Sequence, residues 1–178
     1  RGRQENDGRD RQSPGVKIMR MAVGLFAAFL LAAPALANVA PPPPDSPERA
    51  GETVYAFFEN FNAGNVEGIA STYSDGGNFV WVENGSVSYS DKAAAVAGMT
   101  ERFKATPGAR IETIDGYRII PIGTGGAEVV VPMTLNVKDA KTGEEKQVLS
   151  GVMTLTLQLE KDEWRIVAGH TSTAISMQ

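Results

Sequence analysis

Hydrophobic residues follow a helical spacing in the first half of the chain and an alternating spacing in the second half. In the helical part, apolar side chains recur at i, i+3, i+4 and i+7, which places them on one face of a helix. They are Val54, Phe57, Phe58 and Phe61. Asn65 and Asp91 are good helix-capping residues, and they predict a short second helix after 65 and a third helix over 92–105. The sequence therefore predicts three helices before Thr106.

The alternating part predicts strands that each bury one face. Four long strands are predicted, over 109–121, 128–137, 148–160 and 163–173. A short hairpin is predicted ahead of the third helix, because Phe79–Glu83 and Val87–Tyr89 flank the strong turn signal Asn84-Gly85. Helices followed by an antiparallel meander indicate an α+β domain, in which the helices cover one side of a curved sheet.

Composition divides the chain into four segments. The first is polar and rich in arginine, the second is apolar, the third is rich in proline, and the last carries the periodic patterns. We interpret them as an extension that is disordered or precedes the true translation start (1–15), a signal peptide (16–37), a spacer (38–46) and a single folded domain (47–175).

The apolar second segment is typical of bacterial export signals. Lys17 and Arg20 form a basic start, 21–31 is a short apolar run, and Ala35-Leu36-Ala37 is a small-x-small cleavage site. A buried core helix or a membrane anchor is the alternative, although the run is shorter than the roughly 20 residues that span a bilayer. We therefore expect a periplasmic or extracellular protein that has no membrane contact once the signal is cleaved.

Charge and rare residues narrow the classes of function. Without residues 1–37 the chain keeps 11 basic and 18 acidic residues, a net charge of −7, which makes nucleic acid an unsuitable partner. The chain has no cysteine and one histidine, His170, so thiol chemistry is excluded, and no metal site and no cofactor are predicted.

Three stretches resemble the SnoaL-like branch of the nuclear transport factor 2-like superfamily. They are FFENFNAGNVEGIASTYSD (57–75), FVWVENG (79–85) and EWRIVAGHTS (163–172), and they occur in the family's order with helices and long strands between them. The resemblance covers nearly all of the predicted domain. It implies a cone, in which a strongly curved sheet wraps around the first helix and leaves a pocket at its open end.

The superfamily contains isomerases, cyclases, dehydratases and non-catalytic association domains, so the resemblance leaves the activity open. In ketosteroid isomerases a tyrosine and two aspartates are catalytic. The corresponding positions here are Phe57, a position near Trp81, and Met153, and all three are apolar. These side chains cannot do that acid–base chemistry, and isomerase-type catalytic residues are therefore not found. A slip of two residues near Trp81 would bring in Glu83.

Glu83 and His170 are the candidate catalytic pair. Strict alternation puts Glu83 on the face of Trp81, and His170 and Ser172 on the face of Trp164. If these are the concave faces, the carboxylate and the imidazole meet at the pocket mouth as a proton-transfer pair. The alternative is a half-buried histidine bonded to a backbone carbonyl, and a solvated glutamate.

Other side chains are candidates for lining a ligand pocket, with ordinary core packing as the alternative. The candidate ligand-binding residues are Trp81, Tyr55, Tyr73, Met133 and Ser172.

Three functions remain open at this point. The first is binding of a small apolar molecule in the cone, and the second is an isomerase, dehydratase or cyclase that uses His170 as acid or base. The third is a homodimeric interaction module, because the resemblance implies dimers formed through the outer sheet face. In this sequence that face is predicted to carry Ser150, Thr154, Thr156 and Gln158.

Overall fold

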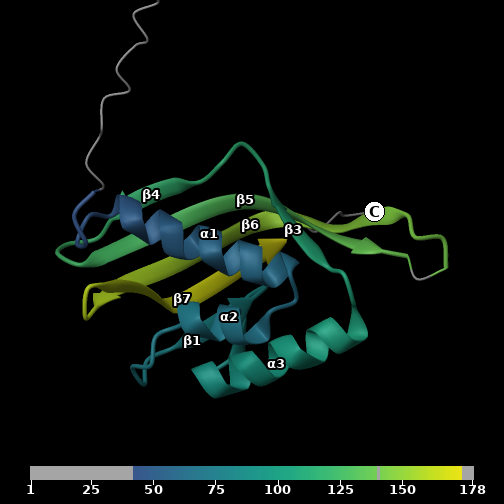
Figure 1. Ribbon diagram of the computed structural model, residues 1–178, viewed down its shortest axis with the longest axis horizontal. Helices are drawn as coiled ribbons and strands as arrows, with labels where there is room; N and C mark the ends of the chain where they lie inside the picture. The colour runs from purple at the N-terminus through teal and green to yellow at the C-terminus, as the bar shows by residue number, and fades with distance from the viewer. Residues whose placement is uncertain (1–41, 140, 174–178) are drawn as a thin grey trace, which may run out of the picture. The chain divides into compact units, whose positions relative to one another are not determined.

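The computed structural model describes residues 42–139 and 141–173. The predicted extension (1–15) and signal peptide (16–37) lie outside the described residues. The described chain contains three helices and seven strands (Figure 1). In order they are α1 (Glu48–Asn62), α2 (Val66–Thr72), β1 (Val80–Glu83), β2 (Ser86–Tyr89), α3 (Lys92–Ala105), β3 (Arg110–Thr113), β4 (Arg118–Pro121), β5 (Gly126–Lys138), β6 (Glu145–Glu160) and β7 (Glu163–Thr173).

Helices α2 and α3 begin where the sequence predicts. The Asn65 side chain accepts a hydrogen bond from Gly68 N at 3.0 Å, and Asp91 accepts one from Ala94 N at 2.8 Å. Each bond satisfies an amide of a first helical turn that has no partner within the helix. Helix α1 turns its apolar stripe toward the sheet, and Val54 and Phe57 are fully buried there.

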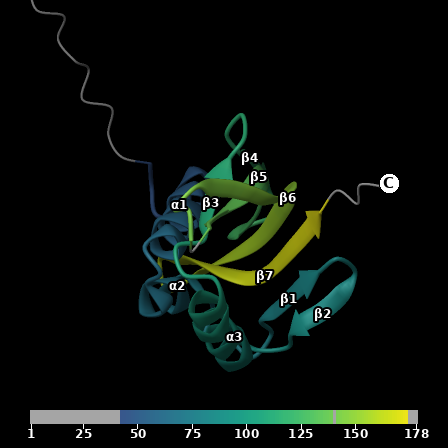
Figure 2. The same cartoon turned by 90° about the vertical axis from the view of Figure 1, so that its right-hand side faces the viewer.

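The sheet has the order β2-β1-β7-β6-β5-β3, and β4 also pairs with β5. Its long centre is the antiparallel set β5, β6 and β7, as the alternating pattern predicts. The hairpin β1–β2 joins this set through a parallel pairing of β1 with β7, so the sheet is mixed rather than a meander of four strands. Figure 2 shows the sheet curving, with helices on its inner side. The α+β fold with a curved sheet is thus confirmed.

The long strand predicted over 109–121 is wrong, because the structure divides it into β3 and β4. Asp115 and Gly116 have positive φ angles of 56° and 79°, a conformation that ends a regular strand. Both pieces still pair with β5, at Thr113↔Met133 and Arg118↔Val130. The four residues between the pieces lie opposite only two residues of β5, so they bulge away from the sheet.

Strand β7 contains a β-bulge that decides which side chains face inward. Leu157 of β6 lies opposite Ile166, and Thr156 lies opposite Ala168, which leaves Val167 as an extra residue. A bulge of this kind shifts the alternation of the strand by one residue. Trp164 and Ile166 are buried before the bulge, and beyond it the buried positions are odd-numbered, Gly169 and Thr171.

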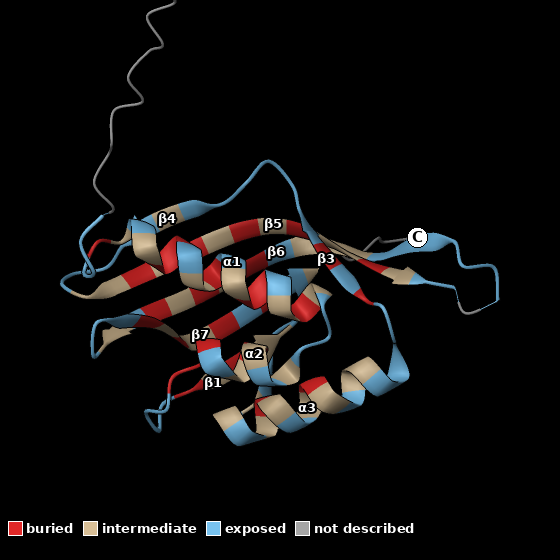
Figure 3. Cartoon of the chain, viewed as in Figure 1, coloured by how far each residue is buried: buried red, intermediate tan, exposed pale blue. Residues whose placement is uncertain are grey.

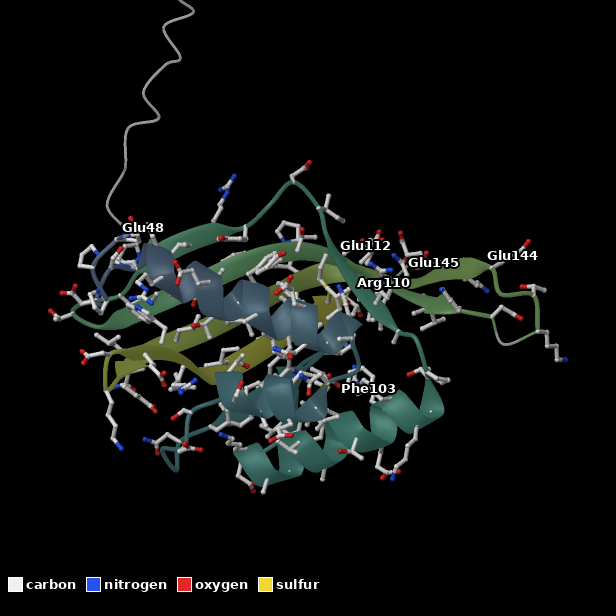
Figure 4. All side chains as sticks on the ribbon, viewed as in Figure 1. Glu48, Phe103, Arg110, Glu112, Glu144 and Glu145 are labelled. Carbon is white, nitrogen blue, oxygen red and sulfur yellow. The ribbon has the colours of Figure 1, made fainter. Side chains whose placement is uncertain are left out.

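Buried residues gather where α1 faces the sheet (Figure 3). Many of them are aromatic. The Phe57 ring has its centroid 5.9 Å from that of Trp81 and 6.1 Å from that of Tyr73. Phe103 extends the cluster from α3, with its ring 5.1 Å from that of Phe61 (Figure 4). These contacts fix α1 and α3 relative to the sheet.

Candidate functional site

A cavity opens to solvent between α1, α3 and the inner face of the sheet, with a volume of about 90 Å³. Apolar side chains from both helices and from β1, β3, β5 and β6 form its wall, and polar groups stand among them. The lining residues are Phe57, Phe61, Trp81, Glu83, Asn84, Met99, Arg102, Ile111, Met133, Leu135, Leu149, Met153, Thr171 and Thr173. A mostly apolar hollow with a few polar groups is the usual form of a small-molecule site.

Three methionines form much of the apolar wall. Met99 comes from α3, Met133 from β5 and Met153 from β6, and all three are buried. Methionine has three rotatable bonds and a polarisable sulfur, so this wall can adapt to ligands of different shape.

A glycine helps to shape the same part of the sheet. A Cβ atom on Gly151 would lie 2.0 Å from the carbonyl oxygen of Ser172, so no side chain fits at this position. Gly151 pairs with Met133 on one side and Thr173 on the other, and both of these residues line the cavity. The missing side chain therefore permits a close backbone approach beside the cavity wall.

The polar side of the cavity is built around an ion pair. Arg102 Nη2 donates to Glu83 Oε1 at 2.9 Å, and each side chain keeps about a third of its surface exposed (33% and 29%). Asn84 holds the adjacent strand end, because its side-chain oxygen accepts from both N and Oγ1 of Thr173 at 3.1 Å. The cavity thus combines an apolar wall with a charged but internally neutralised pair.

His170 lies outside the cavity, so the predicted meeting of His170 and Glu83 is not formed. The extra residue Val167 reverses the alternation, and His170 is exposed on the outer face opposite Thr154. Ser172 lies on the same outer face, with its Oγ 3.2 Å from His170 Nε2. The face expected for both residues was wrong, because strict alternation along 163–173 does not allow for a bulge.

The other candidates separate into three environments. Trp81 and Met133 line the cavity. Tyr55 is 59% exposed, on the side of α1 that faces away from the core. Tyr73 is buried against Phe57 and Trp81 and does not line the cavity. Burial raises the pKa of the Tyr73 hydroxyl strongly, because the phenolate would be desolvated.

Among the described residues, two buried side-chain polar atoms have no hydrogen-bond partner, the Tyr73 hydroxyl and Trp81 Nε1. The benzene ring of the Trp81 indole rests on Gly169, where an added Cβ would lie 2.3 Å from Cε3 and Cζ3 and 2.8 Å from Cδ2. Nε1 belongs to the opposite edge of the ring system and therefore faces away from Gly169. Gly169 is the parallel register partner of Trp81, so this glycine makes room for the indole.

Sequence reasoning missed Arg102, Met99 and Asn84 as site residues. The spacing of Met99 and Arg102 is i, i+3, which could have placed the guanidinium on the apolar face of α3. Asn84 was assigned only a turn, and its φ of 49° confirms that turn. Its second role, holding Thr173, depends on the pairing of β1 with β7 and leaves no local signal.

Within the part of the chain that the structure describes, no three histidine, cysteine, aspartate or glutamate side chains gather as a metal site requires. None of the described helices is long and apolar enough to cross a membrane.

A family model described as a SnoaL-like domain matches residues 51–176 of this sequence. A comparison with curated protein sequences found no significant match.

Solved structures with the same fold include proteins of several kinds. A candidate dehydratase of the NTF2-like family from Streptomyces avermitilis has a TM-score of 0.65 and 18% identity, over 75% of this chain and 99% of that one. An NTF2-like superfamily protein from Salmonella enterica has a TM-score of 0.64 and 10% identity, over 74% of this chain and 93% of that one. A candidate scytalone dehydratase from Novosphingobium aromaticivorans has a TM-score of 0.62 and 10% identity, over 72% of this chain and 83% of that one. At these identities the similarity establishes the fold alone.

Proposed function

Because the chain belongs to the SnoaL-like domain family, with the fold of the NTF2-like superfamily, we propose that it binds a small, largely apolar molecule in the cavity beside Trp81. The observation that carries the proposal is the cavity itself, which is open to solvent and lined by aromatic rings and methionines. Proteins seldom leave such a surface uncovered unless it binds something.

The size of the cavity limits the ligand. Its 90 Å³ is smaller than the apolar cavity of about 150 Å³ that holds benzene in an engineered protein. A ligand larger than a few atoms must therefore displace the methionines or extend through the mouth. Burial of about 200 Å² of apolar surface contributes roughly 5 kcal/mol before the costs of binding. These costs reduce the net free energy, so we expect an affinity no tighter than about 0.2 mM.

A cavity-filling pair of variants tests this proposal. Leu149 lines the cavity, whereas its neighbour Val148 is exposed on the strand and does not line it. Leu149→Trp should reduce the affinity for a small apolar probe, α-methylstyrene, at least tenfold in a titration followed by NMR. Val148→Trp is the matched control and should leave the affinity within twofold. Equal effects of the two variants, or no binding to the wild-type protein, would contradict the proposal.

Proton transfer between His170 and Glu83 is not part of the proposal, since the two side chains do not share the cavity. Glu83 and Arg102 are the ionisable groups in the cavity lining, and they are bonded to each other. Two of the structural neighbours are named as dehydratases, and that activity is part of no proposal for this chain.

We also propose that two copies associate through the outer face of the sheet. The outward positions of β6 support this, because Ser150, Val152, Thr154 and Thr156 carry no charge, and Val152 is 40% exposed. In light-scattering measurements after gel filtration, the wild-type protein should have twice the mass of one chain. Thr154→Arg should halve this mass, and Thr142→Arg, in the exposed β5–β6 turn, should not. A monomeric wild-type protein would exclude this contact.

Export is likewise proposed on the sequence of residues 16–37. Expression of the full sequence in a bacterial host should release a mature protein that begins near Asn38 outside the cytoplasm, as N-terminal sequencing of cell fractions would detect. Recovery of residues 16–37 on cytoplasmic protein would contradict this proposal.

A further inference from the structure

The two tryptophans of the domain differ in the state of their indole N–H groups. Trp164 Nε1 donates a hydrogen bond to the carbonyl oxygen of Pro44 at 3.1 Å. Trp81 Nε1 is buried and has no acceptor among the protein atoms. An unpaired buried donor costs free energy, and groups of this kind are rare in folded proteins, so this one needs a physical explanation.

The surroundings of Trp81 leave no obvious protein acceptor. The Glu83 carboxylate is bonded to Arg102 on one oxygen and to Ser88 on the other. The Phe57 ring lies beside the indole and offers no oxygen. Gly169 has no side chain and lies against the ring near Cε3 and Cζ3, on the far side of the indole from Nε1. Trp81 lines the cavity, and its Nε1 atom has almost no exposed surface. A bound molecule that displaces a side chain of the cavity wall can therefore supply the missing acceptor.

We propose that the molecule bound in the cavity carries an uncharged hydrogen-bond acceptor, such as a carbonyl or ether oxygen, which accepts from Trp81 Nε1. This inference rests on the proposed binding function and specifies its ligand class. An indole N–H can only donate, so the ligand atom that meets it has to accept. A charged acceptor is disfavoured, because the apolar wall would desolvate it while Arg102 is already paired with Glu83.

Two probes of the same shape separate this hydrogen bond from apolar burial. Acetophenone has a carbonyl oxygen where α-methylstyrene has a methylene group, and the two are otherwise alike. The quantity of interest is the ratio of their affinities in each protein variant, because the ratio cancels effects of cavity shape. One hydrogen bond should change the ratio by about fivefold.

Trp81→Phe removes the N–H donor and keeps an aromatic ring. It should lower the affinity ratio of acetophenone to α-methylstyrene by about fivefold relative to the wild-type protein. Trp164→Phe is the matched control, because its N–H already bonds to Pro44, and it should leave the ratio unchanged. Binding of both probes with the same ratio in all three proteins would overturn this inference and leave the binding proposal intact. Failure of both probes to bind the wild-type protein would contradict the binding proposal itself.

An NMR measurement on the wild-type protein avoids any question about the folding of a variant. The ¹⁵N–¹H spectrum contains two indole resonances, and Trp164→Phe assigns them by the loss of one. Acetophenone should shift the Trp81 indole proton downfield, as a new hydrogen bond does, whereas α-methylstyrene should not. A downfield shift of the Trp164 proton instead, or equal shifts with both probes, would overturn the inference.

Discussion

The two ends of α1 lie against parts of the sheet that differ in how completely they are packed. At the closed end, the backbone carbonyl groups of Trp164 and Ile166 both accept hydrogen bonds. Thr53 Oγ1 donates to the Trp164 carbonyl at 3.0 Å, and Ser74 N donates to the Ile166 carbonyl at 2.9 Å. At the open end, around Trp81 and Met153, a cavity remains and an indole N–H has no protein partner.

We therefore expect the two ends of α1 to contribute to different properties, one to stability and the other to binding. The closed end holds α1 in place through buried side chains and satisfied hydrogen bonds, so its substitution should mainly lower stability. The open end has an uncovered apolar surface and a buried indole N–H without a partner, which packing alone does not explain. Substitution there should therefore mainly alter binding. A buried donor without a partner in a well-packed domain requires an explanation, and functional sites are where such groups are expected.

The largest expected effect comes from truncating the closed end. Ile166 is fully buried, so Ile166→Ala should lower the free energy of unfolding by about 3–5 kcal/mol, because it leaves a cavity that cannot collapse. Met153→Ala, at the open end, should cost about 2 kcal/mol, since it enlarges a space that already exists. Urea unfolding of both variants measures the contrast, and equal costs would remove the distinction between the two ends.

The next effect depends on pH and comes from Tyr73. Burial raises the pKa of its hydroxyl in the folded protein, whereas the unfolded chain ionises near pH 10. Unfolding therefore releases a proton above about pH 10, and the free energy of unfolding should fall by about 1.4 kcal/mol per pH unit there. Below that pH both states keep the proton, and this contribution to stability is fully present.

Tyr73→Phe isolates this contribution. The variant should lose less stability than the wild-type protein between pH 9 and 11 in denaturant titrations. At neutral pH it should be as stable or more stable, by about 1 kcal/mol, because it removes a buried hydroxyl without a partner. Tyr55→Phe, at an exposed position, is the control. An unchanged alkaline profile in Tyr73→Phe would mean that the hydroxyl reaches solvent.

A smaller effect is expected for the hydrogen bond between Thr53 and the Trp164 carbonyl. Thr53→Val keeps the shape of the side chain and removes the donor, so it should lower stability by about 1 kcal/mol. The affinity for α-methylstyrene should stay within twofold, because Thr53 does not line the cavity. A loss of affinity greater than this would show that the two ends are coupled.

The smallest effect on stability is expected for the ion pair at the cavity. Glu83 and Arg102 are about a third exposed, so Arg102→Met and Glu83→Gln should each cost less than about 1 kcal/mol. A double-mutant cycle in low and high salt measures their coupling, which should weaken as the salt concentration rises. A coupling energy well above 1 kcal/mol would show that this ion pair stabilises the fold, contrary to the expectation for the open end.

The sequence predicted the helices and the long central strands because their apolar residues repeat with a regular period. The stripe from Val54 to Phe61, the caps at Asn65 and Asp91, and the turn at Asn84-Gly85 all depend on local physics. The cavity-lining positions of Trp81 and Met133 followed from the same alternation.

The errors have a different origin, because they arise from residues that break a period without a distinctive side chain. Val167 is an ordinary strand residue, and only its pairing with β6 makes it a bulge. Asp115-Gly116 is a turn signal inside the strand predicted over 109–121, and the prediction did not take it into account. The ion pair of Glu83 with Arg102 joins a strand to a helix 19 residues later, which no local pattern reports.

Because of the extra residue in β7, inward-facing positions are even-numbered in its first segment and odd-numbered in its last segment. With this alternation Gly169, Thr171 and Thr173 point inward, and the imidazole of His170 points to the outer side of the sheet. If the strand kept Val167 as a regular, paired residue, the last segment would slide by one position, and the chain's single histidine would lie on the inner face without any substitution. One local distortion of the backbone therefore keeps an imidazole out of the cavity, with no change in the amino-acid composition of the strand.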